Sequence, residues 1–489
     1  MRTAEVDLAS FIRLKRADIP FILVIFSVSF LFFTLFSYLF FQSDFFHLRV
    51  ISYAEKARLA LEGSPPRLEN VGFVYPPLPV LITMVFRYPW LTQGVVASLV
   101  YTVALYVGFK FYRNSFWLFA VLPLFLPFLY LSLFRFDVLL FFFLIAMSTY
   151  LLLKYWETDF SLYLFVGGIL FGLAFFVDFS AIYLVAIYGF FLLFRHESSF
   201  SKKLGIALVF LLPSIFFFAF TLFINYVFKG DPFYFLNRYF ELFQDPLVLQ
   251  AKSDFFAALA LVLEFLNLSF PLILPYLVGF FLVKDWRDFY FSPFFLIYVA
   301  PLLVVFLQLR AGTFSFSLSN SVIFIFFLLL FINRMKLRWP IYLAVAISFI
   351  SAPFVFLKSP DRNEVNFARA VLGKEFERNL HFYREVAREI NRLNGRVILD
   401  DKSLYPAVYF VSNIKRLVLP YQYEFYGILA NPCPQVDYAV GVVNSNDAVY
   451  KLYPELASLK LDGCKFYGRV GDAIFFSCSP PCYSDTYLY

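Results

Sequence analysis

Long apolar segments recur along the first 358 residues, and each is interrupted by charged residues, Gly or Pro. A helix that crosses about 30 Å of hydrocarbon needs roughly 20 apolar residues, and many of these segments approach that length. The 489-residue chain contains 73 Phe and is 61% hydrophobic but only 15% charged, whereas about a quarter of the residues of a soluble domain are charged. Lipid is therefore the expected solvent for most of this surface, and the sequence predicts a multi-pass α-helical membrane protein.

We expect eleven transmembrane helices. Their approximate limits are 20–41, 91–110, 115–133, 138–153, 161–177, 179–194, 205–228, 255–283, 290–309, 315–332 and 339–357. The apolar run 76–86 is too short to span and is followed by Arg87, so we interpret it as an interfacial helix. The block 255–283 contains one Glu and two Pro residues, which leaves open either one kinked helix or two short ones.

The basic residues of the loops predict the orientation. A basic segment precedes the first span, and each short inner connection then holds Lys or Arg, as the positive-inside rule requires. We therefore expect a cell-membrane protein with a cytoplasmic amino terminus, and an odd number of spans places residues 359–489 outside. All four cysteines lie in that segment, on the oxidising side, and the sequence does not choose among their three pairings. No run of Lys or Arg is long enough for nucleic-acid binding.

Residues 359–489 have the pattern of an extracytoplasmic α/β domain. A charged stretch with helical period covers 362–394 and ends at Gly395. The segments RVILDD, RLVLP, DYAVGVV and AIFFSC follow, and they are typical of short buried strands. Residues 359–489 have neither the spacing of a zinc site nor a Gly-rich phosphate loop, so we expect a structural or substrate-lid domain. The chain thus divides into a transmembrane module, 1–358, with its first outer loop at 42–76, and a tail, 359–489.

Four aspartates coincide with the outer ends of predicted spans. They are Asp44, Asp137, Asp178 and Asp231. A carboxylate in or beside a membrane costs free energy, so its position indicates function more often than elsewhere. This grouping predicts a site that opens to the exterior above the helix ends. For Asp178 and Asp231 we expect structural roles, and Asp231, which precedes a proline, fits an ordinary turn.

The first outer loop is the richest of these segments. If it is helical from 44 to about 62, Asp44 and His47 lie on one face together with Ile51 and Arg58. An Asp with a His one turn away is a plausible general-base pair, and Arg49 offers a phosphate contact nearby. The alternative is that Asp44 caps the helix and that His47 lies on an interfacial helix without a chemical role.

Several segments together resemble the polyprenyl-phosphate-sugar-dependent glycosyltransferases of the GT-C superfamily, which include protein mannosyltransferases and aminoarabinose transferases. The resemblance covers about the first 240 residues. The matching segments are Asp44 after the first span, Gly63 at the end of the loop helix, Tyr75 to Leu78, Arg135 to Asp137, Gly167 to Leu184, and Asn225 to Leu236. Asp178 stands where the family has a lysine, and Phe45 follows Asp44 where many members have a second acidic residue.

The resemblance implies a sugar donor on a polyprenyl phosphate and an acceptor that is a protein, a lipid or a glycan. It also implies an inverting displacement with Asp44 as general base. The substrate contacts that we expect are His47, Arg49, Tyr75, Arg135, Asp137, Lys229 and Arg310. No cofactor is implied with certainty, and a divalent metal remains an alternative although no adjacent acidic pair supports it.

Two of these residues have equally ordinary interpretations, Asp137 as the ion-pair partner of Arg135 and Arg310 as an interfacial arginine. The competing classes of function are a multi-pass transporter or lipid flippase, and a non-catalytic envelope protein. A transporter usually places its charged features near the bilayer midplane in repeated halves. In this sequence only Glu264 and the Pro271/Pro275 helix fit that pattern.

Overall fold

The structure is a computed structural model and is mostly helical, with one small sheet near the carboxyl terminus. It describes residues 18–71, 76–193, 199–235, 254–284, 293–311, 316–335, 337–433, 435–444, 447–461 and 463–478. The chain divides into two compact units. The helical unit is Met1–Tyr38, Val74–Pro79 and Trp90–Phe376, and the α/β unit is Leu39–Phe73, Val80–Pro89 and Glu377–Tyr489.

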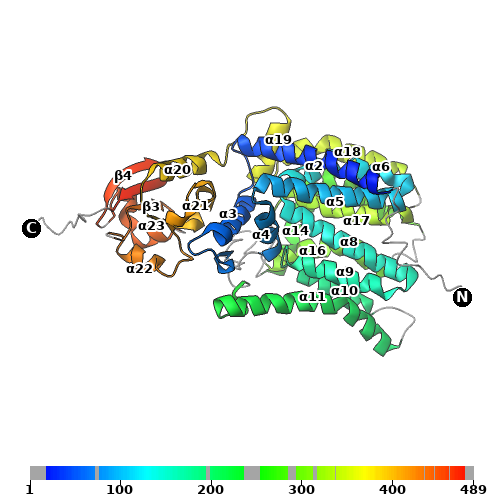
Figure 1. Ribbon diagram of the computed structural model, residues 1–489. Helices are drawn as coiled ribbons and strands as arrows, with labels where there is room; N and C mark the ends of the chain where they lie inside the picture. The colour runs from blue at the N-terminus through cyan, green and yellow to red at the C-terminus, as the bar shows by residue number, and fades with distance from the viewer. Residues whose placement is uncertain are drawn as a thin grey trace, which may run out of the picture. The chain divides into compact units, whose positions relative to one another are not determined.

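Apolar helices make up the helical unit, in which α8, α9 and α11 lie side by side (Figure 1). The helices are α2 (Asp18–Gln42), α4 (Pro77–Phe86), α5 (Pro89–Phe111), α6 (Phe116–Ala120), α7 (Leu126–Phe134), α8 (Phe136–Thr158), α9 (Ser161–Phe175), α10 (Ala181–Leu192), α11 (Phe200–Lys229), α14 (Phe255–Phe281), α16 (Pro293–Ala311), α17 (Val322–Phe331), α18 (Trp339–Phe356) and α19 (Arg362–Val371). The last residues of α2 and most of α4 belong to the α/β unit.

Among the described residues, six helices are long and apolar enough to cross a membrane: α2, α5, α8, α11, α14 and α18. The segment Arg113–Leu124 and α7 together make a seventh if their 57° bend lies within one span. Large apolar side chains such as Leu23, Val28 and Leu31 are exposed on α2, which indicates a lipid-facing surface. The block 255–283 forms one helix that contains both prolines.

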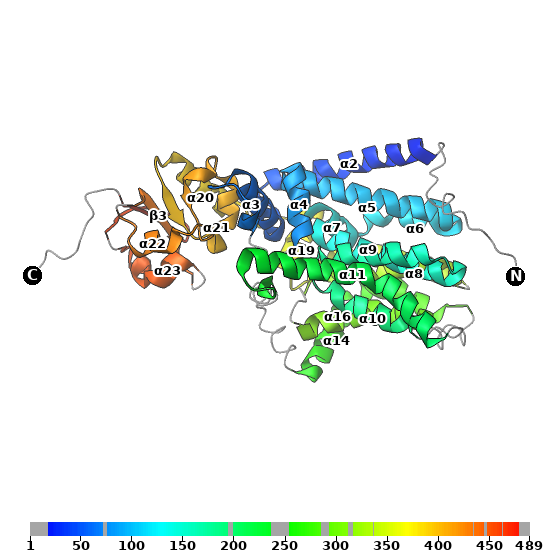
Figure 2. The ribbon, with the colours of Figure 1, turned by 60° about the horizontal axis from the view of Figure 1, so that its bottom comes forward.

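A five-stranded sheet is the centre of the α/β unit, and Figure 2 shows α20 to α23 grouped around it. Its strands are β1 (Val397–Leu399), β2 (Leu417–Val418), β3 (Tyr438–Val442), β4 (Lys465–Val470) and β5 (Ala473–Ser477), in the order β2-β1-β3-β5-β4. The strands β2, β1 and β3 are parallel, and β5 and β4 continue the sheet antiparallel. The helices are α3 (Leu48–Glu62), α20 (His381–Arg392), α21 (Asp401–Phe410), α22 (Phe425–Ala430) and α23 (Ala448–Leu452).

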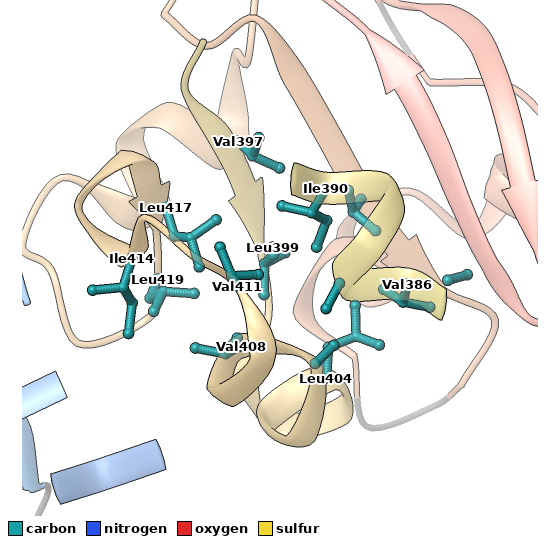
Figure 3. Close-up of a cluster of buried hydrophobic side chains, with 14 of the residues drawn as sticks. Val386, Ile390, Val397, Leu399, Leu404, Val408, Val411, Ile414, Leu417 and Leu419 are labelled. Atoms are coloured by element: carbon teal, nitrogen blue, oxygen red, sulfur yellow. The ribbon is translucent and has the colours of Figure 1, made fainter. Parts of the chain in front are cut away.

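Alternate strand residues enter two cores because successive side chains point to opposite faces of a sheet. Val397 and Leu399 of β1 pack with α20, α21 and Leu59 of α3 (Figure 3). Ile398, between them, packs on the other face with α22 and α23. The four strands expected from the sequence are present, whereas β4 escaped prediction because its side chains are mostly exposed and do not form an apolar run.

The structure also resolves the helices and one disulfide of the tail. The charged stretch 362–394 is two helices, α19 and α20, and not one. The break follows Gly373, whose φ of 68° ends a right-handed helix. Of the cysteine pairings that the sequence left open, the structure contains Cys464–Cys478, which joins the start of β4 to the end of β5.

Candidate functional site around Asp44

Asp44 lies in a turn between α2 and α3 and has a left-handed backbone, with φ of 63°. A right-handed helix cannot include this conformation, so α3 begins only at Leu48, and the predicted helix from residue 44 is wrong. The shared helical face of Asp44 and His47 therefore does not exist. The capping alternative is also wrong, because His47 is the N-cap and its Nδ1 accepts the Arg49 N–H at 3.2 Å.

The Asp44 carboxylate instead meets two residues of α20, more than 330 positions away in the sequence. Its Oδ1 lies 2.9 Å from Nε of Arg384, and its Oδ2 lies 3.2 Å from Nδ1 of His381. The Asp44 side chain is 16% exposed and that of His381 is 56% exposed. The other ring nitrogen of His381, Nε2, lies 3.4 Å from Oε1 of Glu385. An ionised carboxylate is thus held on one edge by an arginine and bordered on the other edge by an exposed imidazole.

The backbone around Asp44 is held by the segment that leads into α20. The Leu380 N–H donates to the Asp44 carbonyl at 2.9 Å. The amide of Asn379 pairs with both backbone groups of Phe46, donating to the carbonyl at 2.8 Å and accepting from the N–H at 3.1 Å. Such pairing from outside the turn is what allows a non-Gly residue to keep a left-handed conformation that costs on the order of 1–3 kcal/mol.

Arg384 is anchored on three sides. Besides its ion pair with Asp44, Arg384 donates to the carbonyl of Phe41 at 2.6 Å, and its guanidinium lies 4.8 Å and 4.9 Å from the ring centroids of Phe41 and Phe410. An arginine in this setting is a fixed positive charge that holds the carboxylate in one orientation. Neither Arg384 nor His381 was singled out from the sequence, because nothing local in the charged stretch 362–394 distinguishes these two residues from its other charged positions.

Arg49, another predicted residue of the first outer loop, has a partner within that loop. Arg49 donates from Nε to the hydroxyl of Tyr53 at 2.9 Å, one turn further along α3. Tyr75 lies outside the described residues. Of the substrate contacts predicted in this loop, the structure thus places His47 at the start of α3 and Arg49 in its first turn.

Arg135 and Asp137 belong to the helical unit and form a buried pair where α7 ends and α8 begins. The guanidinium meets both carboxylate oxygens, Nε to Oδ1 at 3.0 Å and Nη2 to Oδ2 at 3.2 Å. Gln93 of α5 links the same break, donating to the Leu131 carbonyl and accepting from the Phe136 N–H. Asp137 is therefore the ion-pair partner of Arg135, which was one of its two interpretations, and the pair stabilises the junction of the two helices.

Lys229 and Arg310 each lie in the last turn of an apolar helix, α11 and α16. The Lys229 ammonium is 5.8 Å from the ring centroid of Tyr234. The two aspartates for which we expected structural roles both close turns. Asp178 accepts the Ser180 N–H and Asp231 accepts the Phe233 N–H, each at 2.9 Å.

Among the described carboxyl groups of the α/β unit, Glu55 of α3 has the pKa that is furthest from its ordinary value. It is fully buried, and neither oxygen has a hydrogen-bond partner. Its nearest cation is Lys56, at 3.4 Å, whose ammonium also meets Oδ2 of Asp401 at 2.6 Å. Burial raises the pKa of Glu55 to about 8, Lys56 opposes the shift and Asp401 adds to it. This carboxyl is therefore mostly protonated at neutral pH.

A second buried carboxyl, Glu364 of α19, is fully hydrogen-bonded. It accepts from the hydroxyls of Ser317 and Ser359 and from the backbone N–H groups of Leu318 and Ser319. Burial raises its pKa, and neighbouring Asp361 adds to that shift. Four donors on one carboxyl fix α19 to the segment 317–319 within the helical unit, which is a structural role.

The described residues contain no group of three or more His, Cys, Asp or Glu side chains that could hold a metal ion. Comparison with known proteins adds no functional assignment: no protein-family model, curated protein or solved structure matches the chain.

Proposed function

We propose that the protein is a membrane glycosyltransferase that moves a sugar from a polyprenyl-phosphate donor to an acceptor on the outer face of the cell membrane. The observation that carries the proposal is the setting of Asp44. Its carboxylate follows a helix apolar enough to span a membrane, sits on strained backbone and is oriented by Arg384. Strained residues cluster at active sites because the surrounding structure holds them there for function.

In the proposed reaction the sugar undergoes inverting substitution at its anomeric carbon. Asp44 accepts the proton of the acceptor hydroxyl on the face opposite the leaving group, as a general base does in inverting glycoside hydrolysis. The lipid phosphate leaves with the electron pair of the broken bond. General-base assistance of this kind contributes about 10²- to 10⁴-fold to the rate.

The departing phosphate needs fixed positive charge. Arg135 directs its guanidinium to Asp137, and this pair orders the α7–α8 junction. Lys229 and Arg310, each at the end of an apolar helix, are the proposed phosphate contacts. His47, Arg49 and Tyr75 remain proposed contacts of the first outer loop.

The proposal includes the eleven-span GT-C arrangement with a cytoplasmic amino terminus and an extracytoplasmic tail. Seven of the expected spans coincide with the six long helices and the bent pair. The other four coincide with shorter apolar helices, which are Ser161–Phe175, Ala181–Leu192, Ile297–Arg310 and Leu318–Arg334. The expected interfacial helix coincides with the fifth short helix, Pro77–Phe86.

A transporter or lipid flippase is the alternative, and one observation favours it. Glu264 is exposed on α14, in the middle of a helix that is otherwise apolar and contains Pro271 and Pro275. An ionisable residue within a span is often part of a transport pathway. This alternative requires no transfer chemistry at Asp44.

The first experiment compares the wild type with Asp44→Asn in the transfer of radiolabelled sugar from short-chain polyprenyl-phosphate donors. Asn tolerates the left-handed conformation, so the substitution removes the charge and the basicity but not the turn. We expect turnover to fall by about 10²- to 10⁴-fold, whereas Asp231→Asn, in the turn where Asp231 accepts the Phe233 N–H, should retain activity.

Two outcomes would count against the proposal in different ways. Undiminished transfer by the Asn variant would exclude Asp44 as the base while leaving the enzyme class intact. If the wild type transfers sugar from none of the donors, the transporter and non-catalytic classes gain and the enzyme class is rejected.

A further inference from the structure

The imidazole of His381 has a carboxylate at each of its two nitrogens. Nδ1 faces Oδ2 of Asp44 at 3.2 Å and Nε2 faces Oε1 of Glu385 at 3.4 Å. A ring that carries a proton on both nitrogens would therefore have both N–H groups directed at an acceptor. The third charged group at this position, Arg384, contacts the opposite oxygen of Asp44.

The two oxygens of Asp44 differ in their access to solvent. Oδ1 is buried against Arg384, so a proton that arrives at this oxygen has no open route away from it. Oδ2 borders the ring of His381, and more than half of that side chain is exposed. The contact between Oδ2 and Nδ1 therefore connects the carboxylate to solvent through the exposed ring.

The attachment of residues 379–384 to residues 41–46 does not require the His381 side chain. Asn379, Leu380 and Arg384 already join this segment to residues 41–46 through five hydrogen bonds and ion pairs of 3.1 Å or less. The ring of His381 adds two longer polar contacts and little burial. Its position is better suited to proton exchange, for which histidine is the usual side chain near neutral pH.

We propose that His381 relays the proton of the acceptor hydroxyl from Asp44 to solvent. The inference rests on the proposed function, which assigns that proton to Asp44. His381 acts through Asp44 and touches neither sugar nor phosphate.

The proton balance runs in three steps. The acceptor O–H bond breaks as the acceptor oxygen bonds the anomeric carbon, the bond to phosphate breaks with its electron pair, and the proton goes to Oδ2 of Asp44. It then passes to Nδ1 of His381, and the ring, now protonated on both nitrogens, lies between the carboxylates of Asp44 and Glu385. Loss of the Nε2 proton to water beside Glu385 leaves Asp44 ionised again, and exchange with water restores the starting tautomer.

The test is His381→Gln in the full-length protein, with turnover measured in the absence and presence of free imidazole. Gln offers Asp44 a hydrogen-bonding amide but cannot carry a proton onward. We expect turnover to fall by about tenfold or more. Since position 381 is open to solvent, added imidazole should restore part of the loss, which a purely structural role of the ring would not allow.

Glu389→Gln is the matched control, because this residue is on the same helix and pairs with Arg392 rather than with the Asp44 cluster. It should leave turnover unchanged, with or without imidazole. Glu385→Gln should give a smaller loss than His381→Gln because the ring can still release its proton directly to water.

The relay is rejected if His381→Gln turns over at the wild-type rate, or if its loss persists unchanged in imidazole while the fold is intact by circular dichroism. These results leave the glycosyltransferase proposal standing. If the wild type transfers no sugar from any polyprenyl-phosphate donor, both proposals are rejected, so the two failures are distinguishable.

Discussion

At the scale of single residues, Asp44 illustrates how a contact distant in sequence can override a local pattern. The spacing of Asp44, His47 and Arg58 predicted one helical face, and a helix at residue 44 would have satisfied the local preferences. The structure instead gives the Asp44 backbone a φ of 63° and turns its carboxylate to Arg384. Local spacing did not reveal this, because the partner lies 340 positions further along the chain.

The ion pair with Arg384 leads to a prediction about stability. In Arg384→Met the Asp44 carboxylate loses its cation and the Phe41 carbonyl loses a donor. Because both side chains of the pair are partly exposed, we expect a moderate loss of about 1–3 kcal/mol. The loss of stability should appear as faster hydrogen exchange in peptides from 41–47 and 379–384, because these two segments separate more often.

Arg388→Met is the control for this prediction, since Arg388 is on the exposed side of the same helix. Equal exchange in the Arg384 and Arg388 variants would show that the ion pair does not hold the two segments together. Arg384→Lys should be intermediate, because lysine keeps the charge but cannot stack on two aromatic rings in the same way.

At the scale of elements, α3 is joined to the tail by one apolar and two polar attachments. Leu59 enters the core of α20, α21 and β1. Arg58 donates to the carbonyls of Tyr409, Val411 and Ser412 at the end of α21. Lys56 reaches Asp401 at the start of the same helix, and Glu55 is buried beside it.

Glu55 makes this attachment sensitive to pH. Its pKa is about 8 in the folded state against an ordinary value of 4.5, so the docked helix binds one more proton than the undocked helix between these values. Stability from this group is complete below about pH 4.5, decreases as the pH rises, and is lost above about pH 8. The charged or titratable groups around Glu55 are Asp401, Lys56 and Tyr421. Burial also raises the pKa of nearby Asp400, to about 6, which is below the pH range in which Glu55 loses its proton.

We predict that the protection of α3 amides against hydrogen exchange, corrected for intrinsic rates, falls up to about tenfold per pH unit between about pH 6.5 and 8. In Glu55→Gln this fall should disappear. Glu62→Gln, on the same helix but paired with Arg58 at the surface, should retain it. A wild-type protection that is constant across this range would contradict the raised pKa.

The elements also show where pattern recognition was sufficient. The strands β1, β2, β3 and β5 were predictable because each is a short apolar run between turn residues. The stretch 362–394 was not resolved into two helices, since its period continues across the break and only the backbone of Gly373 ends α19. The start of α3 was misplaced because Asp is a preferred N-cap residue, whereas the structure caps the helix with His47.

At the scale of the whole molecule, the expected topology has a direct test. With the tail outside, an impermeant reductant followed by an impermeant maleimide should label Cys464 in intact cells, because this cysteine is partly exposed and its disulfide partner Cys478 is buried. Asn114→Cys, in the expected inner connection before α6, should react only after lysis. Labelling of the tail only after lysis would reverse the orientation.

The sequence by itself determined the solvent and the secondary structure of most of the chain. Long apolar runs require lipid, and short apolar runs between turn residues favour buried strands, because both follow from the solvation of consecutive side chains. Tertiary structure alone decided which charges meet. Asp44 pairs with Arg384 and His381, and Glu55 is buried beside Lys56 and Asp401, because packing brings the loop after α2 against helices that begin more than 330 residues later. Such contacts leave no period in the sequence, so the candidate site emerged only in the folded chain.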